Sequence, residues 1–274
     1  MRQKKFFPLV TTSRKNKQDD SKCAQKFLQT YGGEGCSRGD LSLDALFARN
    51  ESFEDIVVFE NQMPYLYRRG DSVPLYFHLN MAALRLDRIL KGGKDRFLEV
   101  SELKAGAHLL DGTFGLGSDA LIAAYQVGEE GQVTALEASK AIFSLMDFSL
   151  SRLKKSGDSL IPRLLQRIIL KEAHFESFVR SFEDDFFDLV YLDPMFDKPR
   201  LKSSGLNSLR LWAYEAIPTL GTLSEALRVT KEKVIIKEGK ADQWWREFES
   251  SFSSTLTGKR YQSVRYRIIE KEAK

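Results

Sequence analysis

Cysteine and histidine are scarce in this 274-residue sequence. The two cysteines, Cys23 and Cys36, form no CxxC pair and have no histidine cluster nearby. Structural zinc sites and disulfide scaffolds need more of these residues at closer spacing. We therefore expect two reduced thiols and no metal site.

Long apolar runs are missing as well. No segment approaches the ~18 consecutive apolar residues of a transmembrane helix, and the apolar run near the basic N-terminus is too short for a signal peptide. The sequence predicts a cytoplasmic protein without a membrane partner. Its net charge of +4 favours an anionic partner only weakly.

Residues 1–75 have the pattern of a small α/β module. A helix is expected over 21–31, a glycine-rich loop over 32–40 and a short helix in LSLDALFAR. Two segments rich in β-branched and aromatic residues, DIVVFEN and MPYLYRRG, lie on either side of Asn61. This arrangement is typical of a β-hairpin.

Residues 76–274 have the pattern of a second, larger domain. Its first part, YFHLNMAALRLDRILKGG, has the helical period and is expected to be a linking helix. Short apolar strands then alternate with helices, which indicates a mostly parallel α/β sheet covered on both faces. The expected strands are 107–110, 133–136, 168–170, 187–192 and 234–236. Near the C-terminus, a turn at Gly258 and the alternating residues Val264, Tyr266 and Ile268 predict an added antiparallel hairpin.

The segment AHLLDGTFGLGSDA (107–120) combines a strand, a glycine turn and a helix start. Gly115, Gly117 and Ala120 satisfy the dinucleotide pattern G-x-G-x-x-G/A, and Glu137 ends the next strand. Asp111 ends the first strand. The same spacing suits both a nicotinamide dinucleotide and S-adenosylmethionine (SAM), so the turn alone leaves the cofactor open.

The fourth expected strand ends in the sequence LDPMF, which favours SAM. It resembles the Asp/Asn-Pro-Pro-Tyr/Phe motif of methyltransferases that act on exocyclic amines. The lone pair of such an amine is delocalised into the base. If Asp193 and the Pro194 carbonyl accept the amine N–H groups, they orient the lone pair toward the methyl group, while Phe196 stacks on a flipped or unpaired base.

Together, DGTFGLGSDA, LEAS, VYLDPMF and VIIKE resemble the bacterial RsmJ-type family of SAM-dependent methyltransferases over about residues 105–270. The resemblance implies a Rossmann-like class I methyltransferase fold and N2-methylation of a guanine in small-subunit ribosomal RNA. It also implies that the SAM site is lined by Ser118, Asp119, Glu137, Ala138, His174, Phe175 and Asp193. Ser118 stands where better-known members often have arginine, and residues 1–75 show little resemblance, so the chain resembles a divergent branch of the family.

Basic residues after the LDPMF segment favour a nucleic-acid partner. Four of them follow without an intervening acid and are expected to contact RNA phosphates: Lys198, Arg200, Lys202 and Arg210. For the basic residues of the C-terminal hairpin, phosphate contact and a solvated surface are equally plausible, and the N-terminal basic run favours a solvated surface. Lys237, at the end of the fifth strand, is placed to approach the substrate pocket.

The sequence therefore predicts a SAM-dependent methyltransferase that acts on an exocyclic base amine, with guanine N2 of small-subunit ribosomal RNA favoured and a monomer expected. Three alternatives stay open. They are an adenine-N6 methyltransferase on RNA or DNA, an NAD-dependent oxidoreductase, and an RNA-binding factor that keeps the SAM fold without catalysis.

Overall fold

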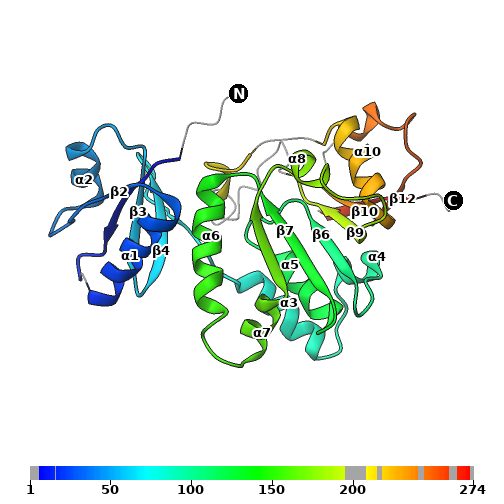
Figure 1. The fold of residues 1–274 in the computed structure, drawn as a ribbon, viewed down its shortest axis with the longest axis horizontal. Helices are drawn as coiled ribbons and strands as arrows, with labels where there is room; N and C mark the ends of the chain where they lie inside the picture. The colour runs from blue at the N-terminus through cyan, green and yellow to red at the C-terminus, as the bar shows by residue number, and fades with distance from the viewer. Residues whose placement is uncertain are drawn as a thin grey trace. The chain divides into compact units, whose positions relative to one another are not determined.

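The computed structural model describes residues 6–15, 17–194, 208–214, 218–239, 244–258 and 264–271. These residues form two compact units (Figure 1). The first comprises the described parts of Met1–His78, Lys140–Leu153 and Leu201–Trp212; the second comprises those of Leu79–Ser139, Lys154–Arg200 and Ala213–Lys274. None of the helices in these ranges has the length and apolar character needed to cross a bilayer.

The described residues of the second unit build a seven-stranded sheet in the order β11-β12-β10-β9-β6-β7-β8. Its strands are β6 (His108–Asp111), β7 (Gln132–Glu137), β8 (Ile168–Glu172), β9 (Phe187–Leu192), β10 (Thr230–Gly239), β11 (Thr255–Thr257) and β12 (Val264–Glu270). The five strands from β6 to β10 pair in parallel, and β12 runs antiparallel to β10 and β11. The predicted parallel strands and the C-terminal hairpin are confirmed.

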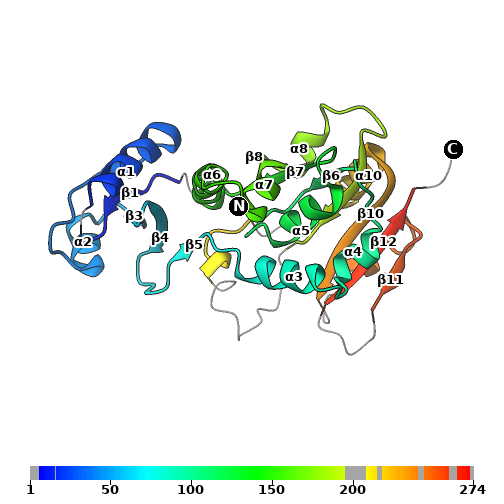
Figure 2. The same cartoon turned by 90° about the horizontal axis from the view of Figure 1, so that it is seen from below.

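Helices cover the two faces of this sheet (Figure 2). They are α3 (Asn80–Leu90), α4 (Arg96–Ser101), α5 (Ser118–Val127), α7 (Leu160–Gln166), α8 (Phe175–Val179) and α10 (Leu220–Val229), with a short 3-10 helix at Trp244–Glu247. Helix α5 is inaccessible to solvent over most of its length because its small side chains, such as Ala120, Ala123 and Ala124, pack closely. The core on the other side contains Phe187, Val190, Val234 and the buried face of α10.

The strand order has a switch point at β6. From β6 the chain proceeds outward through β7 to β8, then returns to β9 on the other side of β6 and continues to β10. Open α/β sheets bind ligands at such a switch point, at the carboxyl ends of the strands. Asp111, Glu137 and Asp193 all lie at this edge.

The first unit contains a mixed five-stranded sheet in the order β2-β1-β3-β4-β5 among the described residues. Its strands are β1 (Leu9–Thr12), β2 (Glu34–Gly35), β3 (Asp55–Glu60), β4 (Met63–Arg68) and β5 (Leu75–Tyr76), and its helices are α1 (Gln18–Tyr31), α2 (Leu43–Arg49) and α6 (Lys140–Leu153). The predicted hairpin is confirmed, because β3 and β4 pair antiparallel around Asn61 and Gln62. Both turn residues have positive φ angles, of 49° and 65°, as a tight hairpin turn requires.

The two faces of this sheet are covered by different helices. On one face, Phe59 of β3 packs against Phe27 of α1 and Phe148 of α6. On the other face, Ile56 and Val58 form a core with residues of α2. Helix α6 follows β7 in sequence, yet it packs in the first unit, which the local sequence pattern did not indicate.

Candidate active site

The glycine turn after β6 is tightly packed. The Gly112 N–H donates to the Tyr191 carbonyl at 2.9 Å, and a Cβ at Gly112 would lie 2.5 Å from the Leu192 side chain. Gly115 and Gly117 have φ angles of 55° and 73°, a left-handed conformation that favours glycine. Helix α5 therefore begins at the carboxyl edge of the sheet, beyond the end of β6, and its first N–H groups have no partner within the helix.

Asp111 ends β6 and is 2% exposed. Its carboxylate accepts a hydrogen bond of 3.0 Å from the Thr113 N–H. Burial raises the pKa of Asp111 to about 7, and the negative charges of Asp119 and Asp193 act in the same direction.

Glu137 ends β7 and joins two turns. One of its carboxylate oxygens accepts from the Ser139 N–H at 2.8 Å, and the other accepts from the Gly115 N–H at 3.3 Å. Burial raises the pKa of Glu137 to about 7, although these backbone bonds favour the ionised form. The carboxylate is thus held against the glycine turn.

Asp119 lies in the first turn of α5 and binds three side chains. One oxygen accepts from Arg85 at 2.6 Å, and the other accepts from the Tyr191 hydroxyl at 2.8 Å and the Lys237 ammonium at 3.0 Å. Burial alone would raise the pKa of Asp119, but the positive charges of Lys237 and Arg85 hold it well below its usual range. Both oxygens of this predicted cofactor residue thus have protein partners.

Lys237, on β10, connects Asp119 with Asp193. Its ammonium donates to the Asp193 carboxylate at 2.7 Å, and its side chain is only 20% exposed. Burial would lower the pKa of Lys237, but the two carboxylates outweigh that effect and raise it. The Asp193 N–H donates to the Thr113 hydroxyl at 2.6 Å. The end of β9 is therefore tied both to β10 and to the glycine turn.

Arg85 extends this network of charges beyond the sheet. It lies on α3 and donates to Asp95 at 2.8 and 2.9 Å, while Asp95 caps the N-terminus of α4 through the N–H groups of Phe97 and Leu98. No motif marked Arg85, because its partners lie on other elements. In the sequence, the helical period of α3 predicts the helix that carries Arg85, but it does not predict the ion pairs of Arg85 with Asp95 and Asp119.

The other predicted cofactor residues lie around the same turns. Ser118 is the first residue of α5, Ala138 follows β7, and Phe175 is the first residue of α8 and lies next to Gly112. His174 precedes α8, and its ring packs edge-on against Tyr214 with the ring centroids 4.7 Å apart.

The predicted substrate residues are described only in part. Pro194 follows Asp193 and is buried. Phe196, Lys198, Arg200 and Lys202 lie outside the described residues, and Arg210 belongs to the first unit.

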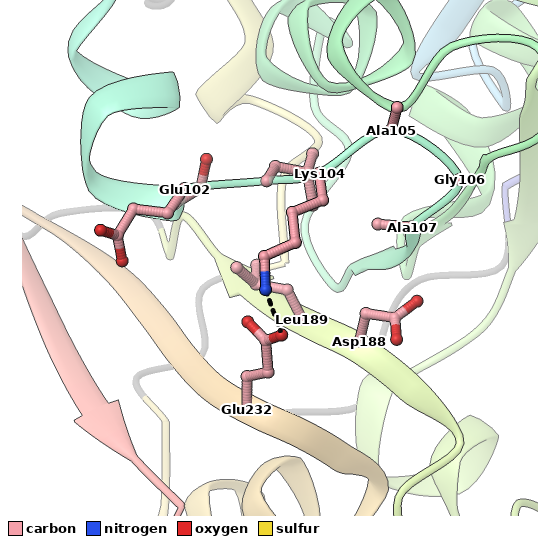
Figure 3. Close-up of a pocket in the computed structure, with 10 residues that line it drawn as sticks. Glu102, Lys104, Ala105, Gly106, Ala107, Asp188, Leu189 and Glu232 are labelled. Carbon is pink, nitrogen blue, oxygen red and sulfur yellow. Dashed lines mark hydrogen bonds and ion pairs between the residues drawn. The ribbon is translucent and has the colours of Figure 1, made fainter.

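A pocket of about 190 Å³ lies at the opposite edge of the sheet (Figure 3). Its lining includes Ala107, Leu189 and Glu232, at or near the amino ends of β6, β9 and β10. The Lys104 ammonium bridges to Glu232 at 3.3 Å within it. Since ligands of open α/β sheets bind at the carboxyl ends of the strands, this pocket is separate from the candidate active site.

Comparison with known families identifies the cofactor. Residues 48–264 match the family model described as "Putative SAM-dependent methyltransferase". The chain belongs to this family. The methyltransferase therefore uses SAM, and the NAD-dependent oxidoreductase alternative is excluded.

Relatives of the methyltransferase agree with this assignment. This chain is 28% identical over 262 residues to the uncharacterized protein YpiP of Bacillus subtilis strain 168. The alignment covers 96% of this chain and 99% of the relative. It is 27% identical over 235 residues to "Ribosomal RNA small subunit methyltransferase J" of Vibrio vulnificus, with 81% and 88% of the two chains covered. The resemblance to the RsmJ-type family is confirmed.

A solved structure confirms the fold. A SAM-dependent methyltransferase from Neisseria gonorrhoeae aligns with a TM-score of 0.62 over 96% of each chain, at 15% identity. The predicted Rossmann-like class I methyltransferase fold, with its antiparallel hairpin, is thus correct.

The charges at the carboxyl edge of the sheet fit SAM. Among the described residues, Asp111 and Glu137 have no cation within ion-pair distance, and their hydrogen bonds come from neighbouring backbone and hydroxyl groups. Buried carboxylates of this kind are costly unless polar or positive groups approach them. SAM offers ribose hydroxyls, an ammonium and a positively charged sulfonium. Glu137 can hold the ribose hydroxyls and Asp111 can face the positive groups.

Proposed function

We propose that this methyltransferase acts on an exocyclic base amine of RNA, and that the amine is guanine N2 of small-subunit ribosomal RNA. The observation that supports this proposal is the position of Asp193 and Pro194 at the carboxyl end of β9, directly across from the glycine turn on β6. The ribosomal RNA small subunit methyltransferase J of Vibrio vulnificus, a relative over most of its length, supports the choice of RNA.

The chemistry that Asp193 performs follows from the poor nucleophilicity of a base amine. Bound SAM supplies an electrophilic methyl group on a positively charged sulfur. In our proposal, Asp193 and the Pro194 carbonyl accept the two amine N–H groups, so the nitrogen lone pair is directed away from them. As the nitrogen becomes positive, the carboxylate stabilises the developing charge. No covalent intermediate with the protein is required.

The neighbouring residues keep Asp193 in position. Lys237 holds one carboxylate oxygen of Asp193, and Thr113 holds its backbone N–H. Each contact fixes the Asp193 carboxylate relative to the glycine turn. Misplacement of a reacting group by about 1 Å can lower the rate by a factor of about 100. In the same proposal, Phe196 stacks on the base, and Lys198, Arg200, Lys202 and Arg210 contact phosphates.

The role of Asp193 can be tested by separating methyl transfer from cofactor binding. We expect Asp193→Ala to abolish transfer of a tritiated methyl group from SAM to RNA of a deletion strain, while calorimetry shows unchanged SAM binding. Asp188→Asn is a matched control, because Asp188 lies at the amino end of the same strand and pairs with Lys231. If saturating SAM restored turnover to Asp193→Ala, the residue would serve the cofactor and not the amine.

The identity of the base can be read from the product. Digestion of the labelled RNA to nucleosides is expected to yield N2-methylguanosine, and mapping of the nucleotide that loses its methyl group on gene deletion is expected to locate it in small-subunit ribosomal RNA. N6-methyladenosine would contradict the guanine assignment. SAM and RNA binding without transfer would indicate an RNA-binding factor.

A further inference from the structure

One face of the five-stranded sheet presents a row of aromatic rings. Strand pairing sets Tyr65 opposite both Val58 and Tyr76, and Tyr67 opposite Ile56. Residues that face each other across strands lie on the same side of a sheet, so the three tyrosines share the face that α2 covers at Ile56 and Val58. Together with His78, which contacts Tyr76, they are called the tyrosine face.

Three rings of the tyrosine face form a row of contacts, in which Tyr65 and His78 are partly buried and Tyr76 is exposed, while Tyr67 packs against the core under α2. The centroids of Tyr65 and Tyr76 are 5.3 Å apart, and those of Tyr76 and His78 are 5.1 Å apart. Tyr76, the middle ring, is 38% exposed. A cross-strand aromatic pair can stabilise a sheet. That role does not explain why the outer surface of the Tyr76 ring is exposed to solvent. Accessible aromatic rings in a row are the usual support for stacked bases.

Two arginines lie close together at the same face. The Nε groups of Arg14 and Arg38 both donate to the Leu41 carbonyl, at 3.3 and 3.0 Å. Sharing one oxygen brings the two guanidinium groups next to each other. Among the described residues, neither arginine has a carboxylate within ion-pair distance. They are called the arginine pair.

The arginine pair lies near Tyr67, because both arginines bind the Leu41 carbonyl and Leu41 packs against the same core as Tyr67. Burial and the charge of Arg14 lower the pKa of Arg38, while Tyr67 and Glu60 act in the opposite direction. The negative charge of Glu60 acts on the pKa of both Arg38 and Tyr67 and raises each of them. Two adjacent cations without an ion-paired acid repel each other, and a bound phosphate would relieve that repulsion.

We propose that the tyrosine face stacks unpaired bases of the RNA substrate while the arginine pair holds an adjoining phosphate. This inference rests on the proposed RNA substrate and adds a second contact with it, distant in sequence from Asp193. Single-stranded RNA fits these groups better than a duplex, because a duplex hides the faces of its bases and leaves nothing to stack on tyrosine.

The test uses the full chain and a fluorescently labelled, unstructured RNA oligonucleotide, with binding followed by anisotropy. Tyr76→Ala is expected to weaken binding about tenfold, because base stacking on an aromatic ring is lost. Tyr76→Phe keeps the ring and should bind as the unaltered protein does. Arg14→Ala should also weaken binding and reduce its dependence on salt, because one phosphate contact is lost.

A matched control for charge is Lys26→Ala. Lys26 is exposed on α1, which packs on the opposite face of the sheet, and its removal changes the net charge by the same amount as Arg14→Ala. We expect RNA binding by Lys26→Ala to be unchanged. A duplex of the same length should bind the unaltered protein and Tyr76→Ala equally.

The outcomes distinguish this proposal from the function on which it rests. If Tyr76→Ala and Arg14→Ala bind the oligonucleotide as the unaltered protein does, while the unaltered protein still methylates RNA, the tyrosine face is not an RNA surface and the proposed function stands. If the unaltered protein transfers no methyl group to RNA but Tyr76→Ala still weakens binding, the face is supported and the proposed function fails.

Discussion

Lys237 links the first turn of α5 with the end of β9, which carries the candidate catalytic residue Asp193. It is mostly buried and pairs with Asp119 on α5 and Asp193 after β9. The two carboxylates would repel each other without it. Removing one partner from a buried ion pair leaves uncompensated charge, which costs far more than the loss of a surface pair.

We expect Lys237→Met to lower the free energy of unfolding by about 3 kcal/mol, because it leaves Asp119 and Asp193 without their shared cation. Urea unfolding measures this change. Lys231→Met is the control on the same strand. Lys231 also forms an ion pair, with Asp188 at 2.8 Å, but its side chain is 50% exposed, so the expected loss is below about 1 kcal/mol. Equal losses would show that Lys237 has no special structural role.

Glu137 makes the stability of the protein depend on pH in an unusual direction. Its pKa is about 7 in the folded protein, against a usual value of 4.5. Between these values the unfolded chain has released the proton while the folded chain retains it. Rising pH therefore favours the unfolded state in this range, by up to about 3 kcal/mol for this one group.

Glu137→Gln removes that titration. The free energy of unfolding of the unaltered protein, relative to Glu137→Gln, should fall as pH rises from about 4.5 to about 7 and then stay level. Urea unfolding of both proteins at pH 5, 6, 7 and 8 gives the difference, in which the other titrating groups largely cancel. A difference independent of pH would show that Glu137 titrates normally in the folded protein.

At the scale of elements, glycines near two helices differ in why the fold needs them. At the start of α5, both the backbone conformation and the packing of Gly117 require glycine. Gly117 has a φ of 73°, and a Cβ there would lie 2.5 Å from the ring of Phe114. Gly92, just beyond α3, has a φ of 81° with no heavy atom within 4 Å of its Cβ position. The first position combines backbone strain with a steric clash, and the second has strain alone.

Gly117→Ala is therefore expected to cost about 3 kcal/mol of unfolding free energy, and Gly92→Ala about 1 kcal/mol. Displacement of Phe114 should also move the glycine turn, so Gly117→Ala should weaken SAM binding in calorimetry while Gly92→Ala does not. If the two variants lost equal stability, the packing of Phe114 against Gly117 would be irrelevant to the turn.

The elements that the sequence predicted best are those with strong local patterns. The strand 187–192 has the bounds of β9, and the hairpin around Asn61 follows from β-branched residues on either side of a turn. Strands β1 and β2 were not anticipated. They have four and two residues, and their parallel partners are distant in sequence, so no local period marks them.

At the scale of the molecule, the candidate site was predicted in part. The glycine turn and the acids Asp111, Glu137 and Asp193 follow from strand ends, because the carboxyl ends of neighbouring parallel strands meet at one edge. Arg85 was missed, and Asp119 was expected at the cofactor without its three side-chain partners. These contacts depend on how α3, α5 and β10 pack together.

The sequence by itself determined the class of fold and favoured SAM as the cofactor, because strand periods, glycine positions and the LDPMF segment are local properties of the backbone and of the chemistry it presents. The tertiary structure alone decided that Lys237 joins Asp119 and Asp193, and that α6 packs with α1. Lys237 and Asp119 are 118 residues apart in sequence. Their contact arises from the return of the chain to the other side of β6, where the ends of distant strands become neighbours and buried charges must find partners.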